Sequence, residues 1–390
     1  MKTLIELYDE RPIENVLSTE VFRPEETILI CPPDKANDMV WREQLRRYFE
    51  ARGCRVKLTF IPVSLLNARR IEKTLRGVLE SHEDCAIDIS GGTDATLFAA
   101  GAAAGSDTPV FTYSRKSNTF YEIQNAPFAR ALPCDVKLDA ASCFLMAGGE
   151  LLPGREDNAV LRRMLPKIDA ICDCFFRFRS IWNRQIACVQ HISQPTGQDL
   201  TASGELRVKV DRGWAELSPD WLRALEEHGL ISGLRLTDKD VSFQFDSAMV
   251  RFWLRDIGAA LELYVFQSCL KAGCFDDVVL SAVVSWRKQD LKREAVTNEI
   301  DVMAIQGVHP LFISCKTSEI RTEALNELAI LRDRFGGAVS RAMIVSSAGT
   351  RRVPAQTLRR ASELRIEVVD WRDIEKGNLL KCLMNQKDES

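Results

Sequence analysis

The sequence has 390 residues, of which 46% are hydrophobic and 27% are charged. This composition is typical of a soluble globular protein with two or three domains, and it excludes disordered and fibrous chains. The formal net charge is only −3. Any nucleic-acid site must therefore be a local basic patch on a nearly neutral surface.

The twelve cysteines are scattered and lie mostly inside apolar runs, and the N-terminal segment has no signal-peptide pattern. We therefore expect reduced core cysteines in a cytoplasmic protein. The closest spacings, Cys172 with Cys174 and Cys269 with Cys274, lack the paired arrangement of a zinc site. No apolar run reaches the roughly 18 residues of a membrane span, so we expect no membrane partner.

Residues 1–135 alternate between apolar strands and helical segments. Strands are predicted at 3–9, 27–33, 56–63, 85–90 and 109–114, with helices at 38–53, 65–80 and 94–104. This alternation predicts an α/β domain with a parallel sheet that is covered on both faces, a Rossmann-like fold. A hairpin is expected to follow at 114–123.

The pattern changes after about residue 135. Residues 136–246 suggest a long aromatic-rich helix at 160–190 and then a strand, a helix and a strand pair, which is typical of a helical, winged-helix-like linker. Residues 247–390 follow the order αβββαβαβ and predict a second, separate α/β domain.

The segment NEIDVMAIQGVHPLFISCKTS, residues 298–318, has charged residues inside two predicted strands. Because side chains alternate across a strand, Glu299 and Asp301 should share one face and Ile300 and Val302 the other. A turn near 306–310 allows registers that place Asp301 opposite Ser314 or Lys316.

A carboxylate pair beside a lysine suits hydrolysis of phosphodiesters with Mg²⁺ or Mn²⁺. These ions take oxygen ligands, acidify a bound water and neutralise developing charge. Glu262, in the helix just upstream, is the candidate for one more carboxylate. The alternative is a half-exposed hairpin in which Glu299 and Lys316 form a weak surface ion pair.

Glu262 on a helix, Asp301 in a strand and ISCK ending in Lys316 resemble the PD-(D/E)XK nuclease core. The resemblance implies a restriction-endonuclease-like domain, a metal-dependent endonuclease activity and metal binding by Glu262, Asp301 and Cys315. It also implies a catalytic set of Glu262, Glu299, Asp301, Ser314 and Lys316. Ser314 departs from the pattern, because a carboxylate normally stands there; Glu299 or Glu262 could compensate.

The segment AIDISGGTDATL places Gly91 and Gly92 between a buried strand and a helix. Ligands of open α/β sheets bind at the carboxyl ends of strands, and backbone amides at a helix start attract phosphate. The motif lacks GxGxxG and the P-loop lysine. Its alternative is a tight turn in which Thr93 caps the helix.

Together, DERPIENVL after the first strand and DISGGTDATL resemble the CARF domain, a Rossmann-like sensor of cyclic oligoadenylates in CRISPR type III immunity. The resemblance implies a ligand-binding set of Asp9, Glu10, Arg11, Pro12, Ile13, Asn15, Ser90, Gly91, Gly92 and Thr93. Family members commonly have lysine or asparagine after GGT, whereas this chain has Asp94, which is unfavourable beside a polyanion unless it faces away.

The two resemblances combine into the architecture of CRISPR ancillary nucleases. They imply activation by cyclic tetra-adenylate, a homodimer, and a DNA or RNA substrate. Candidate groove cations are Arg287, Lys288, Lys292, Arg293, Arg332, Arg334, Arg351 and Arg352, although any one could simply be a solvated surface residue.

Two other functions remain open. One is a cyclic-oligoadenylate-responsive, nucleic-acid-binding regulator with a non-catalytic nuclease-like domain, although the helix SPDWLRALEEHGL is more acidic than a recognition helix should be. The other is a dinucleotide-dependent enzyme, which the missing GxGxxG disfavours.

Overall fold

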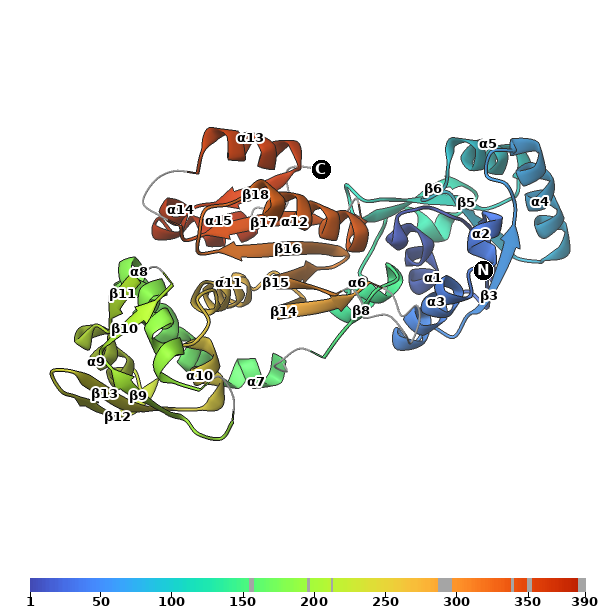
Figure 1. The fold of residues 1–390 in the computed structure, drawn as a ribbon. Coiled ribbons are helices and arrows are strands. Elements are labelled where there is room, and N and C mark those ends of the chain that lie inside the picture. The colour runs from blue at the N-terminus through green and yellow to red at the C-terminus, as the bar shows by residue number, and fades with distance from the viewer. Residues whose placement is uncertain are drawn as a thin grey trace.

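The computed structural model describes residues 1–153, 158–194, 197–211, 213–286, 297–337, 340–348 and 353–384. Figure 1 shows an N-terminal α/β part in blue, a smaller middle module in green to yellow, and a C-terminal α/β part in orange and red. The predicted fold class is confirmed by this arrangement and by the structural comparisons reported below.

The N-terminal sheet has seven strands in the order β3-β2-β1-β4-β5-β6-β7. The first five are parallel, β6 pairs antiparallel with β5, and β7 pairs antiparallel with β6. The order reverses between β1 and β4, where open α/β sheets commonly bind ligands, and we call the edge formed by the loops after these two strands the N-terminal crevice. The strands are β1 (Thr3–Leu7), β2 (Glu26–Cys31), β3 (Lys57–Pro62), β4 (Cys85–Asp88), β5 (Val110–Ser114), β6 (Thr119–Gln124) and β7 (Leu132–Pro133).

Short and long helices cover this sheet. Asp38 caps α3 by accepting from the amides of Val40 and Trp41, as a residue at a helix start should. Helix α4 buries only Ile71, Leu75 and Val78, which recur at helical spacing. The helices are η1 (Pro12–Asn15), α1 (Leu17–Phe22), α2 (Pro33–Ala36), α3 (Met39–Ala51), α4 (Ala68–Ser81), α5 (Asp94–Ala103) and η2 (Pro127–Ala129).

The middle module packs a long helix, α8, against two small β elements. Helix α8 bends where Phe178 leaves helical geometry, and its Trp182 packs edge-on against Trp221 of α9 with ring centres 5.8 Å apart. The elements are α7 (Asn158–Arg163), α8 (Leu165–Ile192), β9 (Thr201–Glu205), β10 (Arg207–Val210), β11 (Gly213–Glu216), α9 (Pro219–Glu227), β12 (Ile231–Leu236), β13 (Asp240–Phe245) and α10 (Ala248–Trp253).

The C-terminal sheet has the order β18-β17-β16-β15-β14-β8. Helix α11 packs on β14, β15 and β16, and α12 on β16 and β17. From α11 to β18 the order is the predicted αβββαβαβ, and two short helices follow. The elements are α6 (Ala140–Met146), β8 (Glu150–Leu151), α11 (Ala259–Ala272), β14 (Asp277–Ser285), β15 (Thr297–Gln306), β16 (His309–Lys316), α12 (Thr322–Phe335), β17 (Arg341–Ser346), α13 (Ala355–Glu363), β18 (Ile366–Val369), α14 (Trp371–Glu375) and α15 (Asn378–Met384).

The N-terminal and C-terminal parts share one apolar core. A single cluster of buried side chains includes Phe111 of β5, Phe144 of α6 and Phe312 of β16. The ring of Phe144 also lies 5.2 Å from the ring of Phe335 in α12. Strand β8, which follows α6, pairs with β14. The segment after the N-terminal sheet therefore packs directly against the C-terminal sheet.

The twelve cysteines are free thiols, and most are buried, as the sequence predicts. Across the described residues we find no helix with the length and apolar character needed to cross a bilayer.

Candidate functional site

The hairpin of β15 and β16 gathers three of the predicted catalytic side chains. Its ladder runs from Gln306–His309 to Val302–Ile313. Beyond that point Oδ2 of Asp301 accepts the amide of Cys315 at 2.6 Å and the hydroxyl of Ser314 at 3.1 Å.

The same carboxylate oxygen lies 3.8 Å from Nζ of Lys316. The side chain of Asp301 thus replaces a backbone acceptor where the two strands separate. This interaction fixes the direction of the carboxylate relative to the ammonium group.

A backbone irregularity lies across from Asp301. Ser281 of β14 has a left-handed backbone with φ +51°, and the regular pairing of β14 and β15 skips it. Ile300 and Val302 pack into different core clusters, one with residues of α12 and one with residues of α11. The prediction that these two side chains share a face is therefore wrong, because the strand alternation breaks at Asp301.

Glu262, in the first turn of α11, lines the same cavity as Asp301. The cavity has a volume of about 160 Å³ and is walled by apolar side chains that include Phe252, Leu263 and Leu280. Its acidic lining comes from three elements, with the carboxylates Asp256, Glu262, Glu299 and Asp301. The helix glutamate and the hairpin therefore lie at one site.

The carboxyl group of Glu262 lies close to several other negatively charged groups. Burial, and after it the negative charges of Asp301, Asp256 and Glu299, together raise its pKa to about 8, while Lys316 opposes the shift. Four carboxylates thus line a small cavity, and the ammonium group of Lys316 lies near one of them. A divalent cation would relieve this excess of negative charge.

The donor set fits a hard cation in part. Mg²⁺ and Mn²⁺ favour oxygen ligands, and Mg²⁺ keeps several waters, so one or two carboxylates with a substrate phosphate suffice. Within the described ranges, no three His, Cys, Asp or Glu side chains meet as a ready-made cage. The carboxylates would therefore supply only part of the coordination shell.

The thiol of Cys315 does not fit the role of metal ligand. It is buried in the core that α11 covers, and burial raises its pKa well above the ordinary value. A protonated thiol is a poor ligand for a hard cation. Cys315 serves the site through its backbone amide, which donates to Asp301.

Asp256 is a residue that the sequence analysis missed. It lies just before α11, accepts the amide of Gly258 at 2.8 Å, and lines the cavity beside Glu262. The signal was present in RDIGAALEL, where an acidic residue directly precedes the helix that holds the candidate glutamate.

The predicted groove cations have a mixed outcome. Arg332 is buried and donates to the carbonyls of Leu364 and Arg365, so it supports the fold and cannot line a groove. Arg334 lines a cavity beside the N-terminal loop rather than the acidic cavity. The remaining predicted cations lie outside the described residues: Arg287, Lys288, Lys292, Arg293, Arg351 and Arg352.

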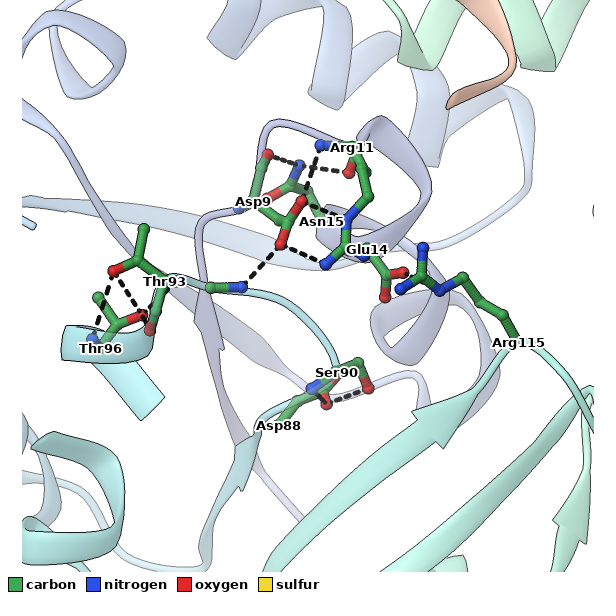
Figure 2. Close-up of polar contacts among 10 residues, drawn as sticks. Asp9, Arg11, Glu14, Asn15, Asp88, Ser90, Thr93, Thr96 and Arg115 are labelled. Atoms are coloured by element: carbon green, nitrogen blue, oxygen red, sulfur yellow. Dashed lines mark hydrogen bonds and ion pairs between the residues drawn. The ribbon is translucent and has the colours of Figure 1, made fainter. Parts of the chain in front are cut away.

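At the N-terminal crevice the two predicted loops meet through Asp9. Its Oδ2 accepts the amide of Gly92 at 2.9 Å, and its two oxygens accept Nε and Nη2 of Arg11, both at 2.7 Å (Figure 2). Asn15 holds the loop closed by exchanging hydrogen bonds with the backbone of Asp9 at 2.9 and 2.7 Å. These loops follow β1 and β4, so they lie where the strand order reverses.

The two glycines are required by this close approach. A Cβ on Gly91 would lie 2.9 Å from Cβ of Asp9, and Gly92 has φ +109°, a left-handed value that favours glycine. Thr93 caps α5 and forms a capping box with Thr96. The predicted alternative, a tight turn in which Thr93 caps the helix, is thus present.

The other predicted ligand-binding residues differ in exposure. Glu10 is exposed, and Arg11 and Pro12 are half-buried. Ser90 turns inward, because its hydroxyl donates to buried Asp88 and accepts the amide of Tyr113. Ile13 is only 2% exposed and packs in the core, so its side chain supports the loop and does not line a ligand site.

Glu14 and Arg115 form a second ion pair at this edge that the sequence analysis did not single out. Nε of Arg115 lies 3.1 Å from Oε1 of Glu14 (Figure 2). Burial raises the pKa of Glu14 to about 7, although Arg115 and Arg11 oppose the shift. Arg115 directly follows β5. The rule that ligands of open α/β sheets bind at the carboxyl ends of strands therefore points to Arg115 as well as to the loops after β1 and β4.

Comparisons with known proteins follow the same division of the chain. Residues 246–389 match the family model described as Card1-like, endonuclease domain. A comparison with curated proteins finds no match.

Three solved structures share the fold. The protein VC1899 from Vibrio cholerae has 18% identity and a TM-score of 0.76, with 99% of each chain covered. Can2 from Sulfobacillus thermosulfidooxidans, in complex with cyclic tetra-adenylate, has 16% identity and a TM-score of 0.70, with 98% of this chain and 99% of that chain covered.

The third is a type III CRISPR defence DNA nuclease activated by cyclic oligoadenylate, with 14% identity and a TM-score of 0.50. The alignment covers 96% of this chain and 51% of that one. The predicted resemblance is thus borne out for the nuclease domain by the Card1-like endonuclease match at residues 246–389, and nearly the whole chain shares the fold of these solved structures.

Proposed function

We propose that this protein is a metal-dependent nuclease that acts in CRISPR type III defence and is activated by a cyclic oligoadenylate. The observation on which the proposal rests is the convergence of Glu262 and Asp301 on one cavity, with Lys316 3.8 Å from the Asp301 carboxylate. The Card1-like domain match, the cyclic tetra-adenylate bound to Can2 and the cyclic oligoadenylate that activates the type III CRISPR nuclease support it.

The oxygens of Asp301 and Glu262 are the ligands that would hold Mg²⁺ or Mn²⁺. When bound, the metal supplies a more acidic water and charge neutralisation at the scissile phosphate. The Cys315 amide orients the Asp301 carboxylate, and the Lys316 ammonium orients the attacking water and stabilises negative charge on the phosphate oxygens. Water loses one proton to solvent as its oxygen bonds to phosphorus, the P–O bond to the leaving sugar oxygen breaks, and that oxygen gains one proton from solvent.

Cyclic tetra-adenylate is the proposed activator, and the crevice between β1 and β4 is its proposed site. The Gly92 amide, the Arg11 guanidinium and the N-terminus of α5 provide donors and positive potential for phosphates. A two-fold homodimer would let a symmetric ring contact the same loops of both subunits. Can2, which shares the fold, is known in complex with this ring.

A direct route connects this crevice to the nuclease sheet. A cavity beside the crevice is lined by Asp9 and Pro12 on one side and by Arg334 of α12 on the other. The N-terminal and C-terminal parts also share a continuous core through α6. Rearrangement of the Asp9 loop would therefore act on α12, and the ring could favour an active state only through higher affinity for that state.

The presence of Ser314 supports one alternative function. It stands where the resemblance predicts a carboxylate, and its hydroxyl donates to Asp301. A non-catalytic domain of this kind would fit a ring-responsive regulator that binds nucleic acid through its middle module. The two functions differ in whether Mn²⁺ and the ring together produce cleavage.

The test is a cleavage panel of single- and double-stranded DNA and RNA with Mn²⁺, with and without cyclic tetra-adenylate. We expect ring-dependent cleavage by the wild type and none by Asp301→Asn. Equal behaviour of both proteins on every substrate would reject the nuclease. Ring binding without cleavage would favour the regulator.

A further inference from the structure

Trp214 is unusually exposed for a tryptophan. Its exposed fraction is 55%, whereas the other six tryptophans are buried or half-buried. It lies on β11 of the small hairpin that β10 and β11 form in the middle module. An exposed indole ring offers a flat surface that needs an explanation beyond packing.

The two faces of this hairpin differ sharply. Val208 and Ala215, directly opposite each other, are 5% and 2% exposed and face the core. Lys209 is directly opposite Trp214, so both side chains point outward. Arg207 lies on the same outward face, with its guanidinium carbon 5.4 Å from the centre of the Trp214 ring. Glu216 is the acidic residue of this face, and it lies opposite Arg207.

Helix α8 extends the cationic surface. Nη2 of Arg184 donates to the carbonyl of Trp214 at 2.6 Å, which fixes the hairpin to the helix. Arg177 is exposed and lies over the ring of Phe178 at 5.0 Å. Arg177 and Arg184 are seven positions apart on α8, on either side of the bend at Phe178, so both add positive charge to this helix.

The other end of this surface reaches the nuclease strand. Arg179 stacks over Trp371 at 4.1 Å, and its Nη1 donates to the carbonyl of Ser347 at 3.5 Å. The amide of Ser347 donates to the carbonyl of Lys316 at 3.0 Å. Helix α8 packs against β10 and β11 of the hairpin and against α11, which covers the C-terminal sheet. The cations of α8 therefore begin beside the strand that carries Lys316.

We infer that this α8–hairpin surface binds single-stranded nucleic acid and guides it toward the acidic cavity. The surface comprises Arg177, Arg179, Arg184, Arg207, Lys209 and Trp214. A base would stack on Trp214 while the arginines of α8 contact phosphates. The inference rests on the proposed nuclease function and specifies its substrate class.

Two physical arguments favour a single strand over a duplex. Base stacking on an aromatic side chain needs a free base face, which a duplex exposes only at its ends. Stacking also tolerates any sequence, which suits a defence nuclease. The local cations matter because the whole chain has a net charge of −3 and offers no general attraction to phosphate.

The test uses fluorescence anisotropy with labelled single strands of about 20 nucleotides, DNA and RNA, in EDTA and without the ring. Trp214→Ala should weaken binding roughly tenfold, and Trp214→Phe should restore most of it. Arg184→Ala should reduce the slope of log affinity against log salt by about one. Circular dichroism of each variant verifies folding.

Two matched controls isolate the surface. Phe98→Ala removes an aromatic ring that is 72% exposed on α5 of the N-terminal part, and Arg223→Ala removes an exposed cation on α9 of the same module. Both should bind like the wild type. Equal affinities for Trp214→Ala and Phe98→Ala, or equal losses for the duplex and the single strand, would overturn the inference.

The outcome is independent of the nuclease proposal because the assay contains neither metal nor ring. Loss of binding in Trp214→Ala would support the surface even if no cleavage were found. Conversely, ring-dependent cleavage with an unchanged KM for single strands in Trp214→Ala would keep the nuclease and reject the surface. A wild type that binds no single strand would also reject it.

Discussion

The carboxylate of Asp9 accepts one hydrogen bond from the backbone amide of Gly92, at 2.9 Å, and another from the guanidinium of Arg11, at 2.7 Å. Burial alone would raise the pKa of Asp9, but the hydrogen bonds from Arg11 and Gly92 outweigh it and lower the pKa. An amide and an arginine are the groups that a phosphate of the ring would use. Asp9 therefore acts as an internal anion at the proposed activator site.

Replacing Asp9 by Asn should strengthen ring binding. The amide side chain keeps an oxygen near Gly92 but removes the charge that holds Arg11 and repels phosphate. We expect the Kd for cyclic tetra-adenylate, measured by calorimetry, to fall roughly tenfold, equivalent to about 1.4 kcal/mol. Asp107→Asn makes the same charge change in an exposed loop at the opposite edge of the sheet and should have no effect. Weaker binding by Asp9→Asn would show that Asp9 organises the site for the ring.

Glu14 should make stability depend on pH. Its pKa in the folded protein is about 7, above the ordinary 4.5, so the folded state binds this proton more tightly than the unfolded state. The stabilisation is fully present below about pH 4.5 and is lost as the pH rises through about 7.

Glu14→Gln cannot lose that proton, so its stability relative to wild type should rise between about pH 4.5 and pH 8. The gain should be on the order of 3 kcal/mol, since the pKa rises from 4.5 to about 7 and one pKa unit is about 1.4 kcal/mol. Urea unfolding at both pH values measures it. A difference between the two proteins that stays constant with pH would contradict the raised pKa.

Ser314 offers a test of metal binding. Its hydroxyl lies 3.1 Å from Oδ2 of Asp301, so Ser314→Asp would add an oxygen ligand and a negative charge beside the proposed metal site. Metal affinity rises with the number of charged ligands, so the Mn²⁺ concentration for half-maximal cleavage should fall roughly three- to tenfold. Ser314→Ala should leave this concentration nearly unchanged. If Ser314→Asp and the wild type needed the same Mn²⁺ concentration for half-maximal cleavage, the metal would not bind beside the Asp301 oxygen that Ser314 contacts.

The order of elements could be read from the sequence because apolar periodicity and turn residues encode it locally. The parallel strands of the N-terminal part and the αβββαβαβ order are examples. The alternation rule also brought Asp301, Ser314 and Lys316 together. It failed for Ile300 and Val302, because the left-handed backbone of Ser281 on a different strand breaks the pattern.

The features of the two sites that the sequence did not predict depend on contacts between segments far apart in the chain. Asp256 joins the cavity only because α11 places its N-terminus over β14 and β15. Glu14 lies within a predicted loop, but its partner Arg115 is about 100 positions away. Burial of Ile13 and Arg332 likewise depends on neighbours that no local pattern specifies.

The most direct measurement of the central claim is the single-turnover cleavage rate with saturating Mn²⁺ and cyclic tetra-adenylate. Lys316→Ala should cut at least about 100-fold more slowly than the wild type, because an ammonium placed at the reacting phosphate is lost. Glu323→Gln, an exposed charge change in the first turn of α12, should cut at the wild-type rate. Equal rates for Lys316→Ala and the wild type, or equal rates for the wild type with and without the ring, would contradict the account.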